Sequence, residues 1–570
     1  MKILLLDLGS SFVKYSFYNP CTLENSQIFS KKFPDALVDD GVYYEVERQK
    51  IDDIIFSIMD EAEQNECEAI FICTQMHGYL IEYKDGFSNY ISWKDRRGER
   101  FVGEFCQQDF IENGTSLKGN LPIVSLRGYS ELKSCRFFTL GSYLAYILTG
   151  NSVTHITDAC ASGFFSADTC ASENEYEGLT LPLAVAEMLP CGNYRGMVVY
   201  PPMGDHQTSF LGSGASWGEA VLNLGTAAQL TALVSDNSKK IALYEYRPYF
   251  LKKERLMTLT GMRSADMEGL VQRVREEIAH LPNIKRVLIC GGASQNSSEI
   301  GSALNKLGYE TDIIERNVGN EGLKRIAGGV YSRRGTMLSE VEFVNFPFLL
   351  KKAGIDFFII DNEHGSFENK TVTSLAMNSK AADVQAIVRL SNNERAMITK
   401  LADGGVNAFL LPMTNCKEDI EKVVEYAKYT PVGRRGISTT RAHTGYGVAD
   451  IKEYMKQANE RMKIYAQIET RLGVENAEQI AKVSGVDGIF VGPNDLSCDC
   501  DCMGDTKKIK DLISLITKAC LKSGKPCGII TTEKELIRHA LLCGCSMVSY
   551  GSEINMLKKG AQEIKNEKYL

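Results

Sequence analysis

The chain has 570 residues, of which 44% are hydrophobic and 24% are charged, and its formal net charge is −8. This length exceeds what one hydrophobic core can organise, so two to four globular domains are expected. The acidic balance argues against a dominant role in binding nucleic acid or anionic membranes. No apolar run approaches the roughly 20 residues of a membrane span. The 17 cysteines form no secreted-type framework, which predicts reduced thiols in a cytoplasmic protein.

Two hairpins with small-residue turns organise the first 333 residues. The first hairpin and the unit that follows it are predicted as strands at 2–8 and 12–18, a helix at 51–64 and a strand at 69–73. The second hairpin and its unit are predicted as strands at 220–224 and 229–234, a helix at 265–281 and a strand at 286–290. This repetition predicts two related lobes, residues 1–208 and 209–333, that face a cleft.

From about Gly335 onward, short apolar runs alternate with longer helical periods. The eight runs are 336–342, 356–361, 385–390, 408–412, 464–469, 488–493, 526–531 and 546–551. Continuous apolar runs indicate parallel strands buried on both faces, so residues 334–570 are predicted to form a (β/α)8 TIM barrel and the whole chain to be α/β. The fourth connection is the longest, and its Gly- and Arg-rich segments at 433–437 and 441–447 predict a functional loop.

Polar residues lie at the carboxyl ends of these predicted strands, where barrels carry their chemistry. They are Asp361, His364, Arg389, Gln467, Glu469, Asp495 and Ser497. Two carboxylates suit a hard cation, an arginine suits an anionic carbonyl compound, and a histidine beside an aspartate suits proton transfer. One aspartate after a strand is often a helix cap, but several strand ends with such residues favour metal-assisted carbon–carbon bond chemistry.

Several short motifs give this region a family resemblance. They are Asp361-Asn-Glu-His-Gly, Val388-Arg389, Pro431-Val-Gly-Arg-Arg-Gly436, Gln467-Ile-Glu469 and Gly492-Pro-Asn-Asp495-Leu-Ser. Through them the region resembles the HpcH/HpaI aldolase family of class II, metal-dependent pyruvate aldolases.

The resemblance implies that Glu469 and Asp495 ligate Mg²⁺, Mn²⁺ or Co²⁺, and that Gln467 and Ser497 support substrate binding. It also implies that Arg389 steadies an enolate, and that His364, oriented by Asp361, acts as acid and base. The loop with Cys498, Cys500 and Cys502 is more acidic and thiol-rich than the family pattern. Its spacing does not match a zinc site, so we favour a surface loop.

The first hairpin has the form of a phosphate-binding turn. Asp7 ends its first strand, and Gly9, Ser10, Ser11 and Lys14 follow. Backbone N–H groups of such a turn face phosphate, a lysine adds charge, and an aspartate holds Mg²⁺ directly or through water. The chain has no Gly-x-x-x-x-Gly-Lys-Ser/Thr segment, which excludes a P-loop kinase.

Three further motifs follow in order along residues 1–333. They are Gly204-Asp205-His-Gln, Asn223-Leu-Gly225-Thr226 and Cys290-Gly291-Gly292-Ala293-Ser294. With them the region resembles the FGGY carbohydrate kinase family, of the actin/hexokinase-like fold. The resemblance implies that Asp205 accepts the sugar hydroxyl proton, that Gly225 and Thr226 hold the ATP phosphates, and that 291–294 hold the adenosine. It implies a sugar site made of Gln75, Met76, His77, Trp93, Asp95 and Arg97, although His77 and Trp93 are also candidates for core packing.

The sequence therefore predicts a bifunctional enzyme of carbohydrate metabolism. Its kinase half is expected to phosphorylate a sugar or polyol with Mg-ATP. Its aldolase half is expected to form or cleave a 4-hydroxy-2-oxo acid from pyruvate and an aldehyde. Two alternatives stay open: the short kinase half can be a non-catalytic sensor or oligomerisation module, and the barrel can cleave or decarboxylate an acyl-CoA. The aldolase resemblance also implies a homo-oligomer.

Overall fold

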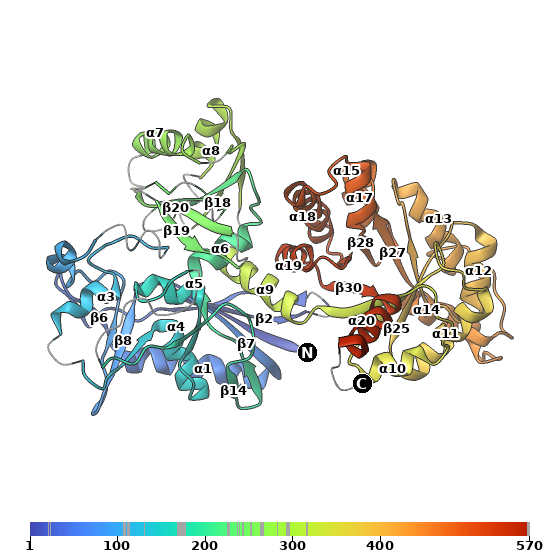
Figure 1. The fold of residues 1–570 in the computed structure, drawn as a ribbon, viewed down its shortest axis with the longest axis horizontal. Coiled ribbons are helices and arrows are strands. Elements are labelled where there is room, and N and C mark those ends of the chain that lie inside the picture. The colour runs from blue at the N-terminus through green and yellow to red at the C-terminus, as the bar shows by residue number, and fades with distance from the viewer. Residues whose placement is uncertain are drawn as a thin grey trace. The chain divides into compact units, whose positions relative to one another are not determined.

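The computed structural model divides into two compact units, Met1–Val330 and Tyr331–Leu570 (Figure 1). It describes residues 1–566 except for 21, 23, 107–109, 111–113, 130–131, 168–177, 225–227, 236–237, 239, 242–243, 251–253, 263–266, 282, 292–296 and 315–316. Within the described part of the chain, every helix is too short or too polar to cross a membrane.

The first lobe is built on a mixed sheet around the predicted first hairpin. β1 (Lys2–Leu8) pairs antiparallel with β2 (Phe12–Asn19) and parallel with β7 (Cys67–Thr74). The predicted helix is α1 (Arg48–Gln64), which buries Ile51, Ile55 and Ile58 on one face at helical spacing. A second sheet in this lobe runs in the order β11 (Arg136–Thr139), β8 (Tyr79–Tyr83), β10 (Tyr90–Ile91), β6 (Tyr44–Val46) and β5 (Val38–Asp39).

The second lobe repeats the pairing of the first. β17 (Glu219–Leu224) pairs antiparallel with β18 (Ala228–Ser235) and parallel with β21 (Arg286–Cys290). β20 (Glu254–Met262) and β19 (Glu245–Pro248) extend the sheet on one side, and β22 (Glu310–Ile313) extends it on the other. α7 (Met267–Ile278) and α8 (Ser297–Lys306) belong to the same lobe. The predicted duplication is confirmed at the level of strand order.

Two helices of this unit pack tightly against each other. α6 (Asp205–Ser213) and α9 (Val318–Val330) approach so closely that a methyl group on Gly212 would overlap the Val318 carbonyl oxygen, and one on Gly322 would overlap that of Thr208. Gly319, in the first turn of α9, lies against the Asp7 carboxylate. A Cβ atom added to Gly319 would lie 2.5 Å from Asp7 Oδ2. Glycine at these positions therefore brings the α9 backbone to the end of β1.

The second unit is a closed parallel barrel of eight strands, as predicted. In order they are β23 (Arg333–Leu338), β24 (Phe357–Asp361), β25 (Gln385–Arg389), β26 (Ala408–Leu411), β27 (Lys463–Ile468), β28 (Gly488–Val491), β29 (Cys527–Ile530) and β30 (Met547–Ser552). β23 begins three residues before the predicted run. Its first residues include two arginines, which an apolar pattern does not mark as part of a strand. Phe357, Ile387, Leu410 and Phe490 fill the interior, and a larger apolar layer lies between strands and helices.

The fourth connection, which the sequence predicts as a functional loop, lies away from the carboxyl ends of the strands. It follows α13 (Lys417–Ala427) and precedes α14 (Ile451–Arg461). Arg435 donates to Asp403 Oδ1 at 2.6 Å, and His443 Nδ1 lies 3.0 Å from the Asp403 carbonyl oxygen. Asp403 ends α12 (Arg395–Asp403), the helix that leads into β26. The loop thus covers the amino ends of the strands.

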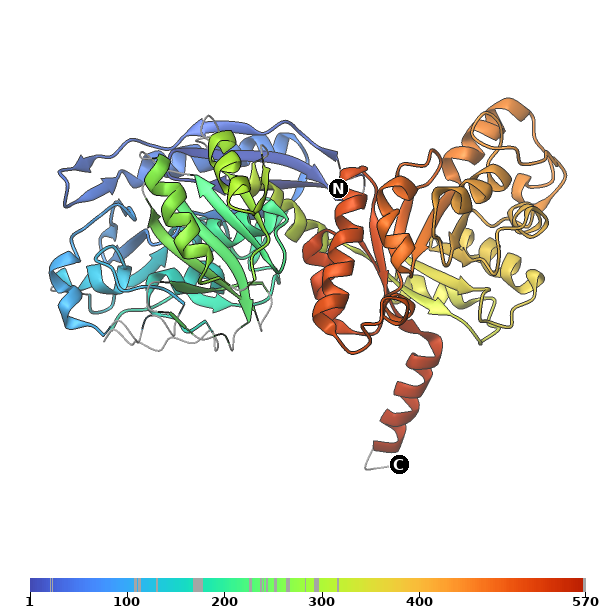
Figure 2. The same cartoon turned by 90° about the horizontal axis from the view of Figure 1, so that it is seen from above.

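The last helix, α20 (Glu553–Asn566), projects from the barrel (Figure 2). Its apolar side chains Ile554, Met556, Leu557 and Ile564 are exposed. Beside its first turn, a cavity of about 370 Å³ is lined by apolar side chains of the outer barrel wall, among them Ile537, Leu541 and Val548.

Candidate active sites

An ion pair occupies the carboxyl ends of β24 and β25. Asp361 and Arg389 lie opposite each other in the parallel register. Arg389 Nε donates to Asp361 Oδ1 at 3.0 Å and Nη2 donates to Oδ2 at 2.7 Å, and both side chains are buried. The guanidinium holds the pKa of Asp361 below its usual value against the opposing effect of burial. This bidentate geometry fixes the arginine fork at the barrel mouth.

The Asp361 side chain contacts Arg389, and its predicted role in orienting the His364 ring stays a prediction. Both Asp361 oxygens face Arg389, and Oδ1 also accepts from the backbone N–H groups of Glu363 and His364 at 3.1 and 3.2 Å. Strand register decides this, because it places Asp361 beside Arg389 while His364 follows in the exposed loop.

Glu363, a residue without a predicted role, is the carboxylate beside the His364 ring. His364 Nε2 lies 3.8 Å from Glu363 Oε2, and Arg389 Nη1 lies 3.2 Å from the same oxygen. Burial raises the pKa of Glu363, with smaller contributions from the charges of Asp361 and Asp495. Its position between Asp361 and His364 in one motif is the sequence feature that indicates a place in this site.

Glu469 follows β27 and is buried beside Gln467. Gln467 Nε2 donates to Glu469 Oε1 at 2.5 Å, and the Met413 backbone N–H donates to Oε2 at 3.0 Å. A side chain on Gly492 would overlap Glu469 Oε1, so the backbone after β28 sets the space for this carboxylate. Burial, together with the charges of Asp495 and Glu363, raises the pKa of Glu469 to about 7, against the hydrogen bond from the Met413 N–H.

The residues at this mouth fit a divalent cation by their donor chemistry. Asp495, exposed in the first turn of α17 (Pro493–Asp499), is near enough to Glu469 to act on its pKa. Gln467 Oε1 is buried and has no hydrogen-bond partner. Two carboxylates and an unpartnered amide oxygen are hard ligands that leave positions for substrate and water. In the described part of the chain, no group of three or more His, Cys, Asp or Glu side chains is placed to hold a metal.

Ser497 and the cysteines after it lie in or beyond α17. The Ser497 hydroxyl donates to the Asn494 carbonyl at 2.8 Å, so its single O–H is used within the helix. Cys498 is exposed, Cys500 is partly exposed and Cys502 is buried.

In the kinase-like unit, the phosphate turn and its aspartate lie where β1 ends. The turn closes with a hydrogen bond from the Gly9 N–H to the Phe12 carbonyl at 3.1 Å. Lys14 lies opposite Asp7 in the antiparallel register, and the Cys73 thiol donates to Asp7 Oδ1 at 3.4 Å. Burial raises the pKa of Asp7, and the Lys14 charge opposes that rise. Ser10 and Ser11 are on the accessible side of this turn.

Asp205 begins α6 beside the end of β7. The short strand β16 (Met203–Gly204) pairs with β7. A Cβ atom added to Gly204 would lie 2.5 Å from Met76 Sδ, so Met76 packs closely against this strand. Gln75, Met76 and His77 follow β7 and so emerge at the same sheet edge as Asp205. Burial and the charge of Asp7 raise the pKa of Asp205 to about 7, while Arg247 opposes the shift.

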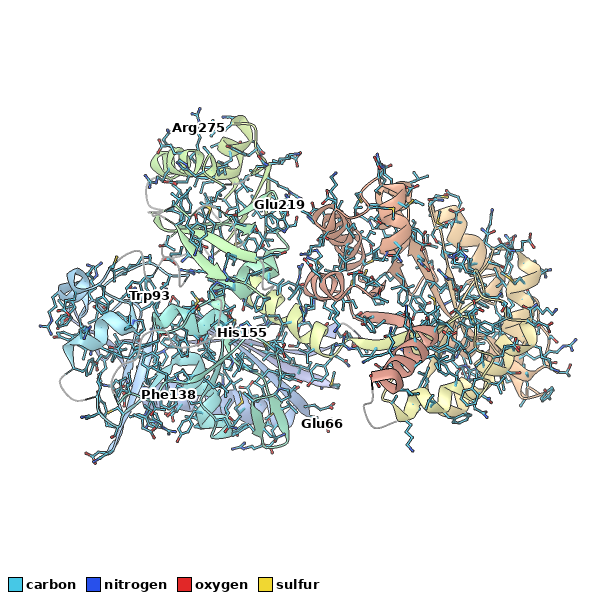
Figure 3. All side chains as sticks on the ribbon, in the orientation of Figure 1. Glu66, Trp93, Phe138, His155, Glu219 and Arg275 are labelled. Carbon is cyan, nitrogen blue, oxygen red and sulfur yellow. The ribbon has the colours of Figure 1, made fainter. Side chains whose placement is uncertain are left out.

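His77 occupies a left-handed backbone position, with φ of 67°, and its Nδ1 lies 2.8 Å from the Ala161 carbonyl oxygen. Burial and the charge of Arg247 lower its pKa to about 4, so its ring is neutral at pH 7. Trp93 is partly exposed in the first lobe, where its carbonyl oxygen accepts from Asn120 (Figure 3).

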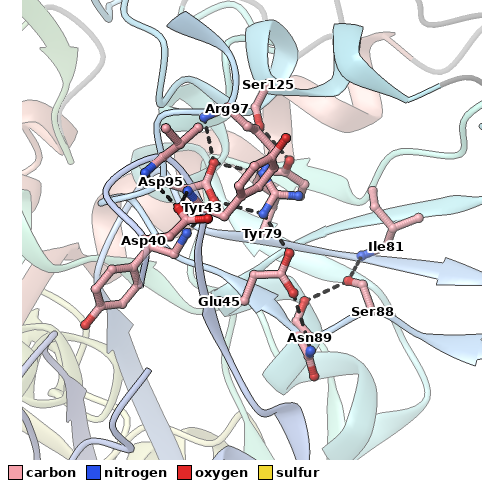
Figure 4. A network of polar contacts seen from close by, with 12 residues as sticks. Asp40, Tyr43, Glu45, Tyr79, Ile81, Ser88, Asn89, Asp95, Arg97 and Ser125 are labelled. Atoms are coloured by element: carbon pink, nitrogen blue, oxygen red, sulfur yellow. Dashed lines mark hydrogen bonds and ion pairs between the residues drawn. The ribbon is translucent and has the colours of Figure 1, made fainter. Parts of the chain in front are cut away.

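Asp95 and Arg97 form part of a closed polar network (Figure 4). Arg97 donates to both Asp95 oxygens at 2.8 Å, to Glu45 at 2.7 Å and to the Tyr129 hydroxyl at 2.6 Å. Asp95 Oδ2 also accepts from the Tyr44 backbone N–H at 2.7 Å. These hydrogen bonds connect the segment after β10 to β6. Asp95 and Arg97 therefore hold these two parts of the first lobe together.

The predicted ATP-binding residues Gly225, Thr226, Gly292, Ala293 and Ser294 lie outside the described residues. Gly291 is described, with φ of 111°, and its ideal Cβ position is 2.5 Å from the Leu224 carbonyl oxygen. The ends of β17 and β21 are therefore adjacent, as their parallel register also shows.

The closed barrel and its strand-end residues place the C-terminal unit in the class of TIM-barrel enzymes. The chain belongs, through residues 349–559, to the HpcH/HpaI aldolase/citrate lyase family. A 5-keto-4-deoxy-D-glucarate aldolase of Salmonella arizonae is 32% identical over 218 residues, which are 38% of this chain and 84% of that protein.

The N-terminal unit has the fold of sugar kinases. A ligand-bound xylulose kinase from Lactobacillus acidophilus aligns with a TM-score of 0.50 and 16% identity, over 58% of this chain and 90% of that one. A gluconate kinase from the same organism aligns with a TM-score of 0.50 and 17% identity, over 58% and 89%. At this identity the likeness establishes the fold.

Proposed function

We propose that the chain is a bifunctional enzyme of carbohydrate metabolism, an aldolase and a sugar kinase in one polypeptide. The barrel forms or cleaves a 4-hydroxy-2-oxo acid through a pyruvate-type enolate, and the N-terminal unit transfers phosphate from Mg-ATP to a hydroxyl group. The observation that carries the aldolase proposal is the fixed Arg389 fork beside Glu363, Glu469 and Asp495 at one barrel mouth. Membership of an aldolase family supports it.

Residues Glu469 and Asp495 would hold a divalent cation, with Gln467 Oε1 beside them. When bound, the cation supplies positive charge to the keto and carboxylate oxygens of the substrate. Arg389 stabilises the oxygen on which negative charge develops when the methyl group loses a proton. His364 is exposed at the mouth and can move that proton, with Glu363 as its nearest carboxylate. Asp361 keeps the arginine in position.

Hydrogen exchange at the methyl group of pyruvate tests this half. In D2O the methyl signal of pyruvate should disappear from the proton NMR spectrum when protein and Mn²⁺ or Mg²⁺ are present. Glu469→Ala should reduce the exchange rate by at least about 100-fold, because the cation loses a ligand and a buried carboxylate is removed. Glu342→Ala, which changes an exposed glutamate on the same barrel, is the matched control. Exchange that continues in excess chelator would contradict the proposal.

For the kinase half, the proposed step transfers the γ-phosphoryl group. The bond from the γ-phosphorus to the β,γ-bridging oxygen breaks, a bond to the substrate oxygen forms, and the hydroxyl proton passes to the Asp205 carboxylate. ADP leaves. Asp205 suits this role because it lies at the edge where β7 and β16 end, and because its pKa of about 7 is that of a base active near neutrality. Asp7 and Lys14 flank the phosphate turn.

The barrel is also proposed to assemble with further copies of the chain. The support is α20, whose apolar side chains Ile554, Met556, Leu557 and Ile564 are exposed. A helix with an uncovered apolar face is typical of an element that packs against a partner.

A further inference from the structure

A buried cluster of charged side chains lies beside Asp205, at residues that carry no recognised motif. Arg247 and Glu245 belong to β19 in the second lobe, and Arg247 donates to Glu245 Oε2 through Nε at 2.7 Å and Nη2 at 2.6 Å. Lys118, from the first lobe, donates to Glu245 Oε1 at 2.7 Å and to Thr260 Oγ1 at 2.8 Å. Ser116 donates to Glu245 Oε1 at 2.6 Å.

Within the cluster Glu245 faces two cations, and Arg247 also acts on the carboxylate of Asp205. Glu245 is 2% exposed and Arg247 is 5% exposed, so their surroundings exclude most water. Lys118 and Arg247 both pair with the Glu245 carboxylate, and the side chain of Lys118 is 42% exposed. Since Arg247 also acts on Asp205, the partly exposed Lys118 is the cation that is most open to an anion from solution.

The cluster belongs to the proposed sugar site. Arg247 acts on the pKa of Asp205, and Arg247, Glu245 and Lys118 all act on that of His77. His206 follows Asp205 directly, and its neutral ring lies near Arg247 and Glu245. His77, Asp205 and this cationic group therefore line one region.

Unfilled hydrogen-bonding groups surround the same region. His206 Nδ1 and Gln75 Nε2 are buried and have no hydrogen-bond partner, while His206 Nε2 lies 3.0 Å from Thr231 Oγ1. Native proteins rarely leave buried polar atoms unpaired, so these atoms are suited to hydroxyl groups of a ligand.

We propose that the substrate of the kinase half is a sugar acid, and that Lys118 and Arg247 bind its carboxylate while Asp205 faces the hydroxyl group to be phosphorylated. This inference rests on the proposed kinase function. A neutral polyol has no use for these positive charges, whereas a carboxylate accepts charge-assisted hydrogen bonds from both cations. A substrate acid also suits a chain whose second unit belongs to a family that includes a 5-keto-4-deoxy-D-glucarate aldolase.

The test uses the full-length protein, Mg-ATP and three matched pairs of substrates. The pairs are gluconate and sorbitol, xylonate and xylitol, and glycerate and glycerol. ADP release should give a higher kcat/KM for the acid in at least one pair. Lys118→Met should lower the ratio of kcat/KM for acid over polyol by roughly 10- to 100-fold, the range of a hydrogen bond to a charged group. Lys118→Arg should retain most of that ratio.

A matched control is Lys50→Met, which makes the same change on α1 at a lysine with 58% exposure of its side chain. Equal kcat/KM for acids and polyols overturns the inference. So does an effect of Lys118→Met that acts through the KM for ATP, which would assign the cluster to the nucleotide.

A failed kinase and a failed inference are distinguishable. If no substrate releases ADP, the kinase proposal is wrong, and equilibrium dialysis with labelled gluconate and labelled sorbitol decides the inference. Gluconate binding that Lys118→Met weakens, without sorbitol binding, supports it. Equal binding of both compounds, or binding of neither, overturns it.

Discussion

Asp361 and Arg389 are neighbours in space because of the pairing of β24 with β25, and this pairing gives Asp361 its function as a positioning residue. The carboxylate holds the guanidinium fork through two hydrogen bonds, and the fork then faces the mouth with one further contact to Glu363. A residue that touches no substrate in this arrangement still controls where positive charge is available.

Asp361→Asn is expected to reduce both activity and stability. Pyruvate exchange should fall by roughly 10- to 100-fold as Arg389 loses its position. The free energy of unfolding of the barrel at pH 7 should fall by on the order of 3 kcal/mol, because a buried cation loses a partner. The folded-state pKa of Asp361 lies below its ordinary value of 3.8, so the stabilisation is present above about pH 4 and is lost as the pH falls through the folded-state pKa.

Urea unfolding at pH 7 and at pH 3 checks this prediction. The difference between wild type and Asp361→Asn should be larger at pH 7 than at pH 3. Asp383→Asn removes an exposed carboxylate that pairs with Lys351 on the outside of the barrel, and it should change neither exchange nor unfolding. A difference for Asp361→Asn that persists unchanged in acid would contradict the pKa argument.

The sequence defines some residues of these sites and not others, for physical reasons. Glu469, Asp495 and Arg389 were predicted because each ends or closely follows an apolar run. The pairing of Asp361 with Arg389 was not predicted. The register between neighbouring strands decides which side chains meet, and the sequence of one strand alone does not specify that register. Lys118, Glu245 and Arg247 come from segments far apart in the chain, and only folding brings them to Asp205.

At the scale of elements, the strands of the barrel were predicted closely because strands buried on both faces are continuous apolar runs. The end of the barrel at which the fourth connection lies was not predicted, because its glycines and arginines indicate a functional loop but not its position. The α6–α9 contact had no sequence signal strong enough to predict it: glycine within a helix is recognisable, but the surface that it meets is not.

The α6–α9 contact makes Gly212→Ala a test of how Asp205 and Asp7 are held together. The added methyl group overlaps the Val318 carbonyl, so the helices must separate. We expect a loss of about 1–3 kcal/mol in the stability of the first unit, as for overpacked cores, with loss of ATP turnover. Pyruvate exchange by the barrel should persist. Differential scanning calorimetry and both assays measure these effects.

Gly328→Ala is the matched control on the same helix. An ideal Cβ at Gly328 meets nothing closer than 3.7 Å, at the Tyr18 hydroxyl. The change should be neutral or stabilising by up to about 1 kcal/mol, since alanine favours helix over glycine. Equal damage from both substitutions would show that α9 tolerates no added volume, and would remove the argument for a specific helix contact.

At the scale of the whole molecule, the two activities are expected to be separable by single substitutions. Asp205→Ala should abolish substrate-dependent ADP release and leave pyruvate exchange intact, and Glu469→Ala should do the reverse. Asp85→Ala, at an exposed position in the first lobe, should leave both activities intact. Nucleotide binding without turnover in the parent chain would favour the alternative of a non-catalytic sensor module.

Gly492 bears no functional group, yet it limits the space that Glu469 has in the barrel mouth. Any residue with a β-carbon there would push Glu469 off its present place and crowd the amide of Gln467. Replacing Gly492 by any other residue should therefore abolish the lyase activity, even though all the acidic, basic and arginine side chains of the site are retained. In searches for inactive copies of this barrel, an alanine at 492 is as informative as the loss of a carboxylate.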